Sequence, residues 1–181
     1  GAVNTIVNDD GKLTGYITDG EGFVNNLKDH GIDIKGKKIT VAGGGGAATA
    51  IQVQCALDGA REITIFNIKD AFFERTLQTA EKIRAAVPGI VVNVYDIADT
   101  AKMTEEIQSS DIFANATIVG MKPMDDQSVV KDLSAFRPGL VVCDAVYNPE
   151  ETKLLREAKE VGCTCIGGKG MLLWQGVAAF K

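Results

Sequence analysis

From residue 38 onward, the chain alternates short runs of β-branched and other apolar residues with longer segments in which apolar residues recur every three or four positions. The short runs are typical of buried strands, and the longer segments are typical of amphipathic helices. The runs predict six strands, at residues 38–42, 62–67, 90–95, 112–116, 140–144 and 163–166. The other segments predict helices at residues 47–58, 71–86, 101–109, 151–161 and 171–180, with a shorter one near 129–136.

This alternation of strand and helix is typical of βαβ units that build a parallel sheet. Because such crossovers are right-handed, the simplest arrangement is a doubly wound parallel six-stranded sheet of order 3-2-1-4-5-6, a Rossmann fold of the α/β class. In a sheet of this order, ligands bind beyond the carboxyl ends of the strands, where strands one and four diverge.

The first 37 residues carry a different pattern. Two short apolar stretches, residues 3–7 and 13–17, flank a turn-forming sequence and predict a pair of strands. Thr18 or Asp19 can then cap a helix that ends near Gly31. The apolar stripe of this helix comprises Phe23, Val24 and Leu27.

A cluster of four glycines follows the first strand of the alternating region, and an alanine-rich helical segment follows the glycines. Read as G-x-G-x-x-A, Gly43 makes the tight turn, Gly45 lets the backbone approach a pyrophosphate, and Ala48 keeps the helix close to the strand. The helix N-terminus adds N–H donors for the anion. No Gly-Lys-Ser/Thr follows, so this is not a Walker loop. The sequence predicts a dinucleotide site here, and the alternative is a tight turn without a ligand.

The carboxyl ends of other strands also carry small or polar residues, which let a flat ligand approach the backbone. Residues 117–121 follow strand four, residues 145–149 follow strand five, and residues 167–171 follow strand six. Each segment alone can be an ordinary loop, but all of them fall at the same edge of the predicted sheet. We therefore expect this edge to hold the ligand.

The end of strand two bears on the choice of cofactor, since an acidic residue there binds the adenosine ribose and an arginine accommodates a 2′-phosphate. Asn67 stands at the strand tip, and Asp70 follows three residues later. Lys69 lacks the planar fork of arginine, and Ile68 offers nothing to a dianion. These residues favour NAD as the cofactor, with NADP as the alternative. Asp70 has a second interpretation, as the cap of the following helix.

Composition and charge narrow the class of protein. The chain has 181 residues, enough for one domain with flanking pieces, and its net charge of −5 argues against a nucleic-acid partner. No apolar run reaches the ~18 residues needed to cross a bilayer, so we expect no membrane partner and a cytoplasmic location. The four cysteines form no C-x-x-C pair and His30 is the only histidine, so we expect no metal site and four buried, reduced thiols.

Five short segments, spread over nearly the whole chain, carry a resemblance to a known family. They are Asn4-Thr5-Ile6-Val7, Gly15-x-x-Thr18-Asp19-Gly20, the loop 43–47, Val146-Tyr147-Asn148-Pro149 and Gly170-Met171-Leu172-Leu173-Trp174-Gln175-Gly176. Together they resemble the shikimate dehydrogenase family, and most of all its quinate/shikimate dehydrogenase branch. The resemblance implies reversible oxidation of one ring hydroxyl of a cyclic polyol acid, shikimate or quinate, with NAD or NADP.

The same resemblance implies roles for individual residues. Asp19 matches the family's catalytic aspartate, which works beside a lysine, because a carbinol that loses hydride must also lose a proton. Asn4, Gln175 and Tyr147 match residues that hold or border the substrate. The implied cofactor contacts are Gly43, Gly44, Gly45, Gly46, Ala47, Asn67, Asp70, Thr117, Ile118, Ala145, Val146, Tyr147, Asn148, Gly168 and Met171. Without the resemblance, Asn4 is a strand-end residue, Gln175 an exposed helix residue and Asp19 a cap.

Three residues depart from the family's pattern. Ile17 stands where an asparagine is usual, Ile68 replaces the usual basic residue after Asn67, and Lys169 replaces a tyrosine. Ile68 weakens the case for NADP. Ile17 and Lys169 lie beside the expected substrate and nicotinamide sites.

The resemblance also divides the chain. Residues 1–18 match the last strands of a substrate domain, residues 19–170 the cofactor domain with its linking helix, and residues 171–181 the start of a helix that returns to the substrate domain. The family's catalytic lysine belongs to the rest of that substrate domain, so we expect this chain to bind NAD weakly and not to catalyse oxidation alone. We also expect poor coverage of apolar side chains near both ends, which favours a homodimer; these are Val3, Ile6, Leu172 and Trp174.

Two other classes of function compete with this one. A non-catalytic dinucleotide-binding module keeps the same fold but has no use for Asp19 and Gln175. A folate-type methylene dehydrogenase has a similar architecture but is not expected to carry the run at residues 170–176.

Overall fold

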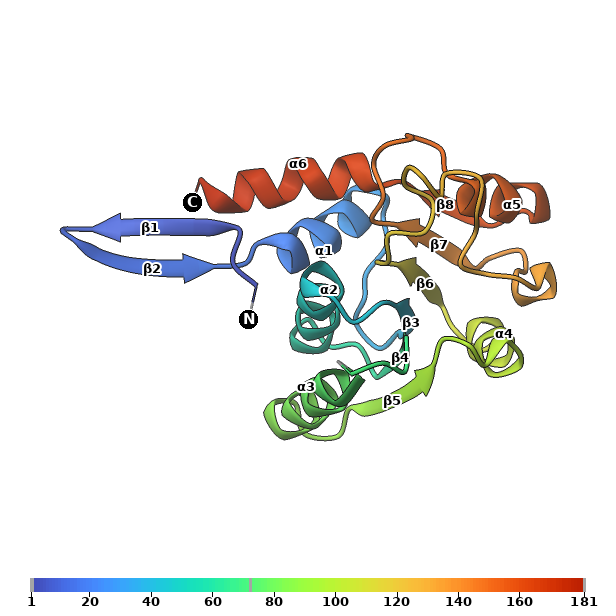
Figure 1. The fold of residues 1–181 in the computed structure, drawn as a ribbon, viewed down its shortest axis with the longest axis horizontal. Coiled ribbons are helices and arrows are strands. Elements are labelled where there is room, and N and C mark those ends of the chain that lie inside the picture. Colours follow the sequence, from blue (N-terminus) through green and yellow to red (C-terminus); the bar gives the residue numbers. More distant parts are fainter. Residues whose placement is uncertain (1, 72, 181) are drawn as a thin grey trace.

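The computed structural model describes residues 2–71 and 73–180 (Figure 1). Gly1, Phe72 and Lys181 lie outside the described residues, and so do the parts of the predicted helix 71–86 and of the predicted segments 1–18 and 171–181 that fall on them. The described chain forms a two-stranded sheet and a six-stranded sheet.

The six-stranded sheet is parallel at every pairing. Its strands are β3 (Lys38–Ala42), β4 (Glu62–Asn67), β5 (Val91–Asp96), β6 (Ile112–Asn115), β7 (Val141–Asp144) and β8 (Thr164–Ile166). Their spatial order is β5-β4-β3-β6-β7-β8, which confirms the predicted doubly wound order 3-2-1-4-5-6. The chain changes direction across the sheet between β3 and β6, so the crevice for a ligand lies at the carboxyl ends of these two strands.

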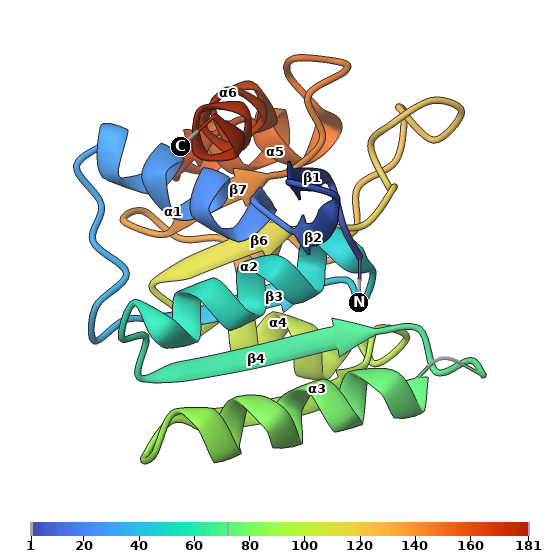
Figure 2. The same ribbon diagram turned by 90° about the vertical axis from the view of Figure 1, so that its left-hand side faces the viewer.

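Helices cover both faces of this sheet (Figure 2). They are α2 (Gly46–Leu57), α3 (Phe73–Ala86), α4 (Thr100–Gln108), the 3-10 turn η1 (Leu133–Ala135) and α5 (Lys153–Val161). Alternate strand residues point to opposite faces, so each face has a core of its own. One core joins Val41 of β3 to Ile51 of α2. The other joins Phe113 of β6 to Ile107 of α4 and Leu154 of α5.

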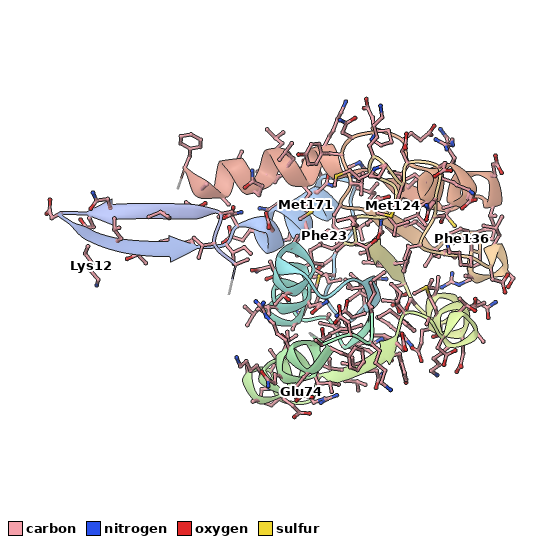
Figure 3. All side chains as sticks on the ribbon, in the orientation of Figure 1. Lys12, Phe23, Glu74, Met124, Phe136 and Met171 are labelled. Carbon is pink, nitrogen blue, oxygen red and sulfur yellow. The ribbon has the colours of Figure 1, made fainter. Side chains whose placement is uncertain are left out.

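A hairpin extends away from the sheet (Figure 1). Its strands β1 (Thr5–Asp9) and β2 (Lys12–Tyr16) pair antiparallel as predicted, and Lys12 marks the distant end in Figure 3. The predicted poor coverage is confirmed at Val3, Ile6 and Leu172, which are 55%, 68% and 45% exposed. Trp174 is half-buried, and its indole N–H donates to Asp29 at 2.5 Å.

Helix α1 (Asp19–Asp29) joins the hairpin to the sheet and packs on both α2 and α6 (Gly168–Ala179). Glycines allow the helices to come this close. A Cβ on Gly20 would lie 2.4 Å from the carbonyl oxygen of Ala50 on α2, and a Cβ on Gly22 would lie 2.6 Å from that of Met171 on α6. Phe23 and Met171 belong to the same core beside this crossing (Figure 3). The position of α6 is therefore set by α1.

Most predicted elements are confirmed with shifted ends, and three differences have local causes. The helix expected near 129–136 is only the turn η1, because the backbone is extended at both Asp132 and Phe136, which bracket it. The last helix begins at Gly168 and not at Met171, because the extended Gly167 is already its N-cap. Thr18 is the N-cap of α1 but makes no side-chain cap; its hydroxyl hydrogen bonds to Asn4 and Gln175 instead.

The prediction of four buried thiols is wrong for two of them. Cys55 and Cys143 are buried, and burial raises the pKa of both thiols. Cys163 and Cys165 are half-buried: Cys165 lies on β8, an edge strand, and Cys163 comes immediately before it. All four are free. Within residues 2–71 and 73–180, the helices are too short or too polar to cross a membrane.

Candidate functional site

The glycine loop lies where β3 ends and α2 begins, at the edge predicted to hold a ligand. Gly43 has a φ of +125°, and a Cβ there would lie 2.7 Å from the carbonyl oxygen of Ala116 in the loop after β6. Gly45 is the N-cap of α2 and makes no side-chain cap, and a Cβ on it would meet no described atom within 4 Å. Ala48 is fully buried against the strand side, as predicted. The first N–H groups of α2 are therefore accessible to an anion.

A cleft of about 550 Å³ opens beside this loop, which is within the range of small-molecule sites. Its walls come from the loops that follow β3, β4, β5 and β6. They include the predicted contacts Gly43, Gly44, Gly45, Asn67, Thr117 and Ile118. The wall after β5, made by Ile97, Ala98 and Thr100, was not predicted, although it too follows the carboxyl end of a parallel strand.

The loop after β4 forms the rim expected to recognise the adenosine ribose. Asn67 Nδ2 donates to Thr76 Oγ1 on α3 at 2.9 Å. A Cβ on Gly44 would lie 2.3 Å from that same nitrogen, so only glycine fits beneath this pair. Ile68 is 60% exposed at the rim. Asp70 lies in the turn before α3, where its carbonyl oxygen accepts the N–H of Phe73 at 3.1 Å; its ribose contact stays a prediction.

Buried polar side chains join the loops after β6 and β7. Asn115 and Asp144 are register partners at the strand ends, and Asn115 Nδ2 donates to Asp144 Oδ1 at 3.0 Å. Asn115 Oδ1 accepts the hydroxyl of Thr117 at 2.7 Å, and Asp144 Oδ1 accepts the N–H of Val146 at 3.0 Å. Thr117 and Val146 were predicted from the sequence, but the residues that hold them were missed. The available signal was a polar side chain at the last position of each buried strand.

Asp144 is 2% exposed, and its environment changes its acidity. Burial raises the pKa of Asp144 to about 6, and the hydrogen bonds from Thr152, Val146 and Asn115 oppose that effect without cancelling it.

A second group of predicted residues meets where the hairpin, α1 and α6 join. Asn4 Nδ2 lies 3.0 Å from Asp19 Oδ1 and 3.3 Å from Gln175 Oε1. Thr18 completes this group, because its hydroxyl donates to Gln175 Oε1 at 3.2 Å and its N–H donates to Asn4 Oδ1 at 3.1 Å. Asn4 is exposed, and Asp19 and Gln175 are half-buried, so a ligand can reach them. Thr18 was predicted as a helix cap and as part of a family motif, but not as a member of this group.

The remaining predicted residues lie around the ends of β7 and β8. Tyr147 is 49% exposed, and within the described chain no hydrogen bond joins it to the group around Asp19. A Cβ on Gly168 would lie 2.5 Å from the carbonyl oxygen of Ala145, so these two predicted contacts adjoin. Met171 is buried in the core. Asn148, in the loop after β7, is exposed, whereas Gly46 and Ala47 lie elsewhere, at the start of α2 after β3.

The described residues hold no group of three or more His, Cys, Asp or Glu side chains that suits a metal ion.

Comparison with known proteins gave close matches along nearly the whole chain, although no family model matches it. A quinate/shikimate dehydrogenase of Escherichia coli O139:H28 (strain E24377A / ETEC) is 49% identical over 180 residues, which cover 99% of this chain and 62% of that protein. The crystal structure of shikimate 5-dehydrogenase from Listeria monocytogenes, in complex with shikimate and NAD, matches with a TM-score of 0.94 and 51% identity, covering 99% of this chain and 62% of that one.

A structure of shikimate dehydrogenase in complex with NADP+ matches with a TM-score of 0.84 and 36% identity, covering all of this chain and 60% of that one. These matches confirm the resemblance that the sequence motifs indicated. This chain spans 62% of the length of the Escherichia coli relative.

Proposed function

We propose that this chain, a homologue of quinate/shikimate dehydrogenases over 62% of their length, is the cofactor-binding part of an NAD(P)-dependent oxidoreductase that interconverts shikimate or quinate and its 3-dehydro ketone. The observation that carries the proposal is the glycine loop, which presents the open N-terminus of α2 to a cleft of about 550 Å³. Similar proteins are complexed with shikimate and NAD, or with NADP+.

The residues of the crevice fit a dinucleotide. The N–H groups at the start of α2 suit a pyrophosphate, and the open space at Gly45 lets the backbone approach it. Asn67 and Asp70 lie on the side expected for the adenosine ribose, and Val146 and Gly168 on the side expected for the nicotinamide. When bound, the nicotinamide ring supplies the hydride acceptor.

The group around Asp19 supports the substrate side of the proposal. Asn4 and Gln175 present amide groups that can orient ring hydroxyls, and Asp19 is placed beside Asn4 to exchange a proton with the reacting hydroxyl. The resemblance assigns the partner lysine to the part of the relatives that this chain does not match. We therefore propose that the 181-residue chain binds cofactor but does not turn over substrate alone.

A non-catalytic dinucleotide-binding module is the alternative. Such a module needs the glycine loop but has no use for a cluster of polar side chains. Here Asn4 lies within hydrogen-bond distance of both Asp19 and Gln175, and the three residues come from separate parts of the chain. That group favours the enzyme.

The choice of cofactor is also a proposal, since the matched structures include both NAD and NADP+ complexes. We propose NAD, because at the ribose rim the exposed Ile68 cannot pair with a 2′-phosphate, and the exposed Lys69 lacks the planar fork of arginine.

Exposed apolar side chains on the hairpin and α6 support the proposed homodimer, which sedimentation velocity of the chain tests directly.

Isothermal titration of the chain with NAD tests the binding site. Gly45→Val should weaken binding at least about tenfold, because a Cβ at this position meets no protein atom within 4 Å, whereas the valine side chain fills space that a pyrophosphate needs. Gly176→Ala on α6 is the matched control, since its Cβ also meets nothing within 4 Å. A wild-type chain that does not bind NAD, or a folded Gly45→Val variant that binds it equally well, would refute the proposed site.

A further inference from the structure

We propose that Asp144 is a positioning residue for the cofactor crevice, which fixes the backbone of the loops after β6 and β7 without itself contacting the ligand. The inference rests on the proposed function, because it assigns to those loops the binding of a dinucleotide.

Three hydrogen-bond donors converge on the carboxylate of Asp144. Asp144 is the last residue of β7 and is 2% exposed. Its Oδ1 accepts the N–H of Val146 and Asn115 Nδ2, each at 3.0 Å, and its Oδ2 accepts the hydroxyl of Thr152 at 2.6 Å. Three donors from three segments are thus held by a single side chain.

Asn115, which Asp144 holds, in turn makes hydrogen bonds that fix the loop after β6. Asn115 Nδ2 also donates to the carbonyl oxygen of Val119 at 3.0 Å, and Asn115 Oδ1 accepts the N–H of Thr117 at 3.1 Å. Thr117 Oγ1 in turn accepts the N–H of Val119 at 3.1 Å. Two of these contacts tie the loop directly to Asn115, the third ties Val119 to Thr117, and Asn115 is held by Asp144.

Thr152, at the start of α5, anchors the carboxylate of Asp144. Thr152 is the N-cap of α5, and its Oγ1 accepts the N–H of Leu155 at 3.4 Å while it donates to Asp144. A Cβ on Gly120 would lie 3.4 Å from Thr152 Cγ2, so the far end of the β6 loop rests on the same threonine. The helix therefore supports both loops through one buried contact.

The chemistry of the group explains why a carboxylate stands here. An apolar side chain would leave the donors of Val146, Asn115 and Thr152 buried without a partner. The side-chain oxygen of an asparagine would still accept the donors of Val146 and Asn115. Its amide nitrogen could donate to the hydroxyl of Thr152, since a hydroxyl also accepts hydrogen bonds. If the loops then hold the binding-competent arrangement only a tenth of the time, the apparent Kd rises about tenfold.

The test compares Asp144→Ala, Asp144→Asn and wild type in NAD titrations of the same 181-residue chain. We expect Asp144→Ala to bind NAD about tenfold more weakly, with faster hydrogen exchange at the N–H groups of Val146 and Thr117, and Asp144→Asn to restore affinity to within about threefold of wild type. Asp33→Ala is the matched control, because it removes an exposed carboxylate that accepts the N–H of Lys35 at the other end of the sheet.

Where Asp144→Ala does not fold, Thr152→Val replaces it, since this change removes the donor to Oδ2 and keeps the methyl group that meets Gly120; weaker NAD binding is again expected. NAD binding by a folded Asp144→Ala or Thr152→Val variant at wild-type affinity would overturn the inference, and so would an equal loss in Asp144→Asn. A wild-type chain that does not bind NAD refutes the proposed function itself, so the two failures are distinguishable.

Discussion

Replacing Asp144 by asparagine should change how the stability of the protein depends on pH. Burial raises the pKa of this carboxyl from 3.8 to about 6 in the folded chain. The folded state therefore binds this proton more tightly than the unfolded state. The contribution of the protonated Asp144 carboxyl to the free energy of unfolding is fully present below about pH 4 and is lost as the pH rises through 6.

The size of the effect follows from the two values. They differ by about 2, and each pKa unit corresponds to about 1.4 kcal/mol, so the titration of Asp144 costs the fold about 3 kcal/mol between acid and neutral pH. About 2 kcal/mol of this change should fall between about pH 4.5 and 7. Asparagine does not titrate, so the stability of the variant relative to wild type should rise by that amount over the same range.

Urea unfolding followed by circular dichroism, repeated at closely spaced pH values, measures both free energies of unfolding. Other titrating groups are shared by the two proteins and cancel in the difference between them. Asp33→Asn controls for the removal of an exposed carboxylate. A difference between Asp144→Asn and wild type that stays constant from about pH 4.5 to 7 would refute the reasoning, whatever its absolute value.

Three further predictions concern packing, charge and specificity. Gly22→Ala should lower the free energy of unfolding by about 1–3 kcal/mol, because its Cβ would lie 2.6 Å from the carbonyl oxygen of Met171; urea unfolding that finds it as stable as Gly176→Ala would contradict this. Lys38→Met should cost about 3 kcal/mol, since Lys38 Nζ lies 2.7 Å from the buried carboxylate of Glu106. In the same assay the exposed Lys28→Met should change stability by less than about 1 kcal/mol, and an equal effect of the two lysine variants would count against a buried charge network. Ile68→Arg should tighten NADP binding about tenfold in titration calorimetry and leave NAD binding unchanged. Ile68→Gln should leave NADP binding as it is in wild type. Equal NADP affinities of Ile68→Arg and wild type would exclude this rim as the specificity site.

The sequence alone determined the sheet and the glycine loop. The order of the six strands follows from the alternation of apolar runs with helical periodicity, because right-handed crossovers leave few ways to arrange such units. Gly43, Gly45 and Ala48 were assigned from their spacing, since each position answers a local backbone constraint that neighbouring residues already reveal. The proposal of NAD over NADP also rests on residues next to one strand end.

The residues around Asp19 show the limit of that reasoning. Seen along the chain, Asn4, Thr18 and Gln175 are a strand-end residue, a helix cap and a helix residue, and only the family resemblance suggested roles for Asn4 and Gln175. Gln175 lies 171 positions from Asn4, and their contact exists because α6 packs against α1 over Gly22. No local pattern encodes that distance.

The tertiary structure likewise decided how deeply individual side chains are buried and which hydrogen-bond partners they meet. Asp144 reads as an ordinary strand-end residue until β6 and β7 are in register, and only then does its carboxylate meet Asn115, 29 positions away. Cys163 and Cys165 were expected to be buried, but Cys165 lies on the edge strand β8 and Cys163 comes just before it, and both are half-buried. Local conformational preferences act over a few residues, whereas desolvation and hydrogen-bond partners depend on what the whole fold brings near.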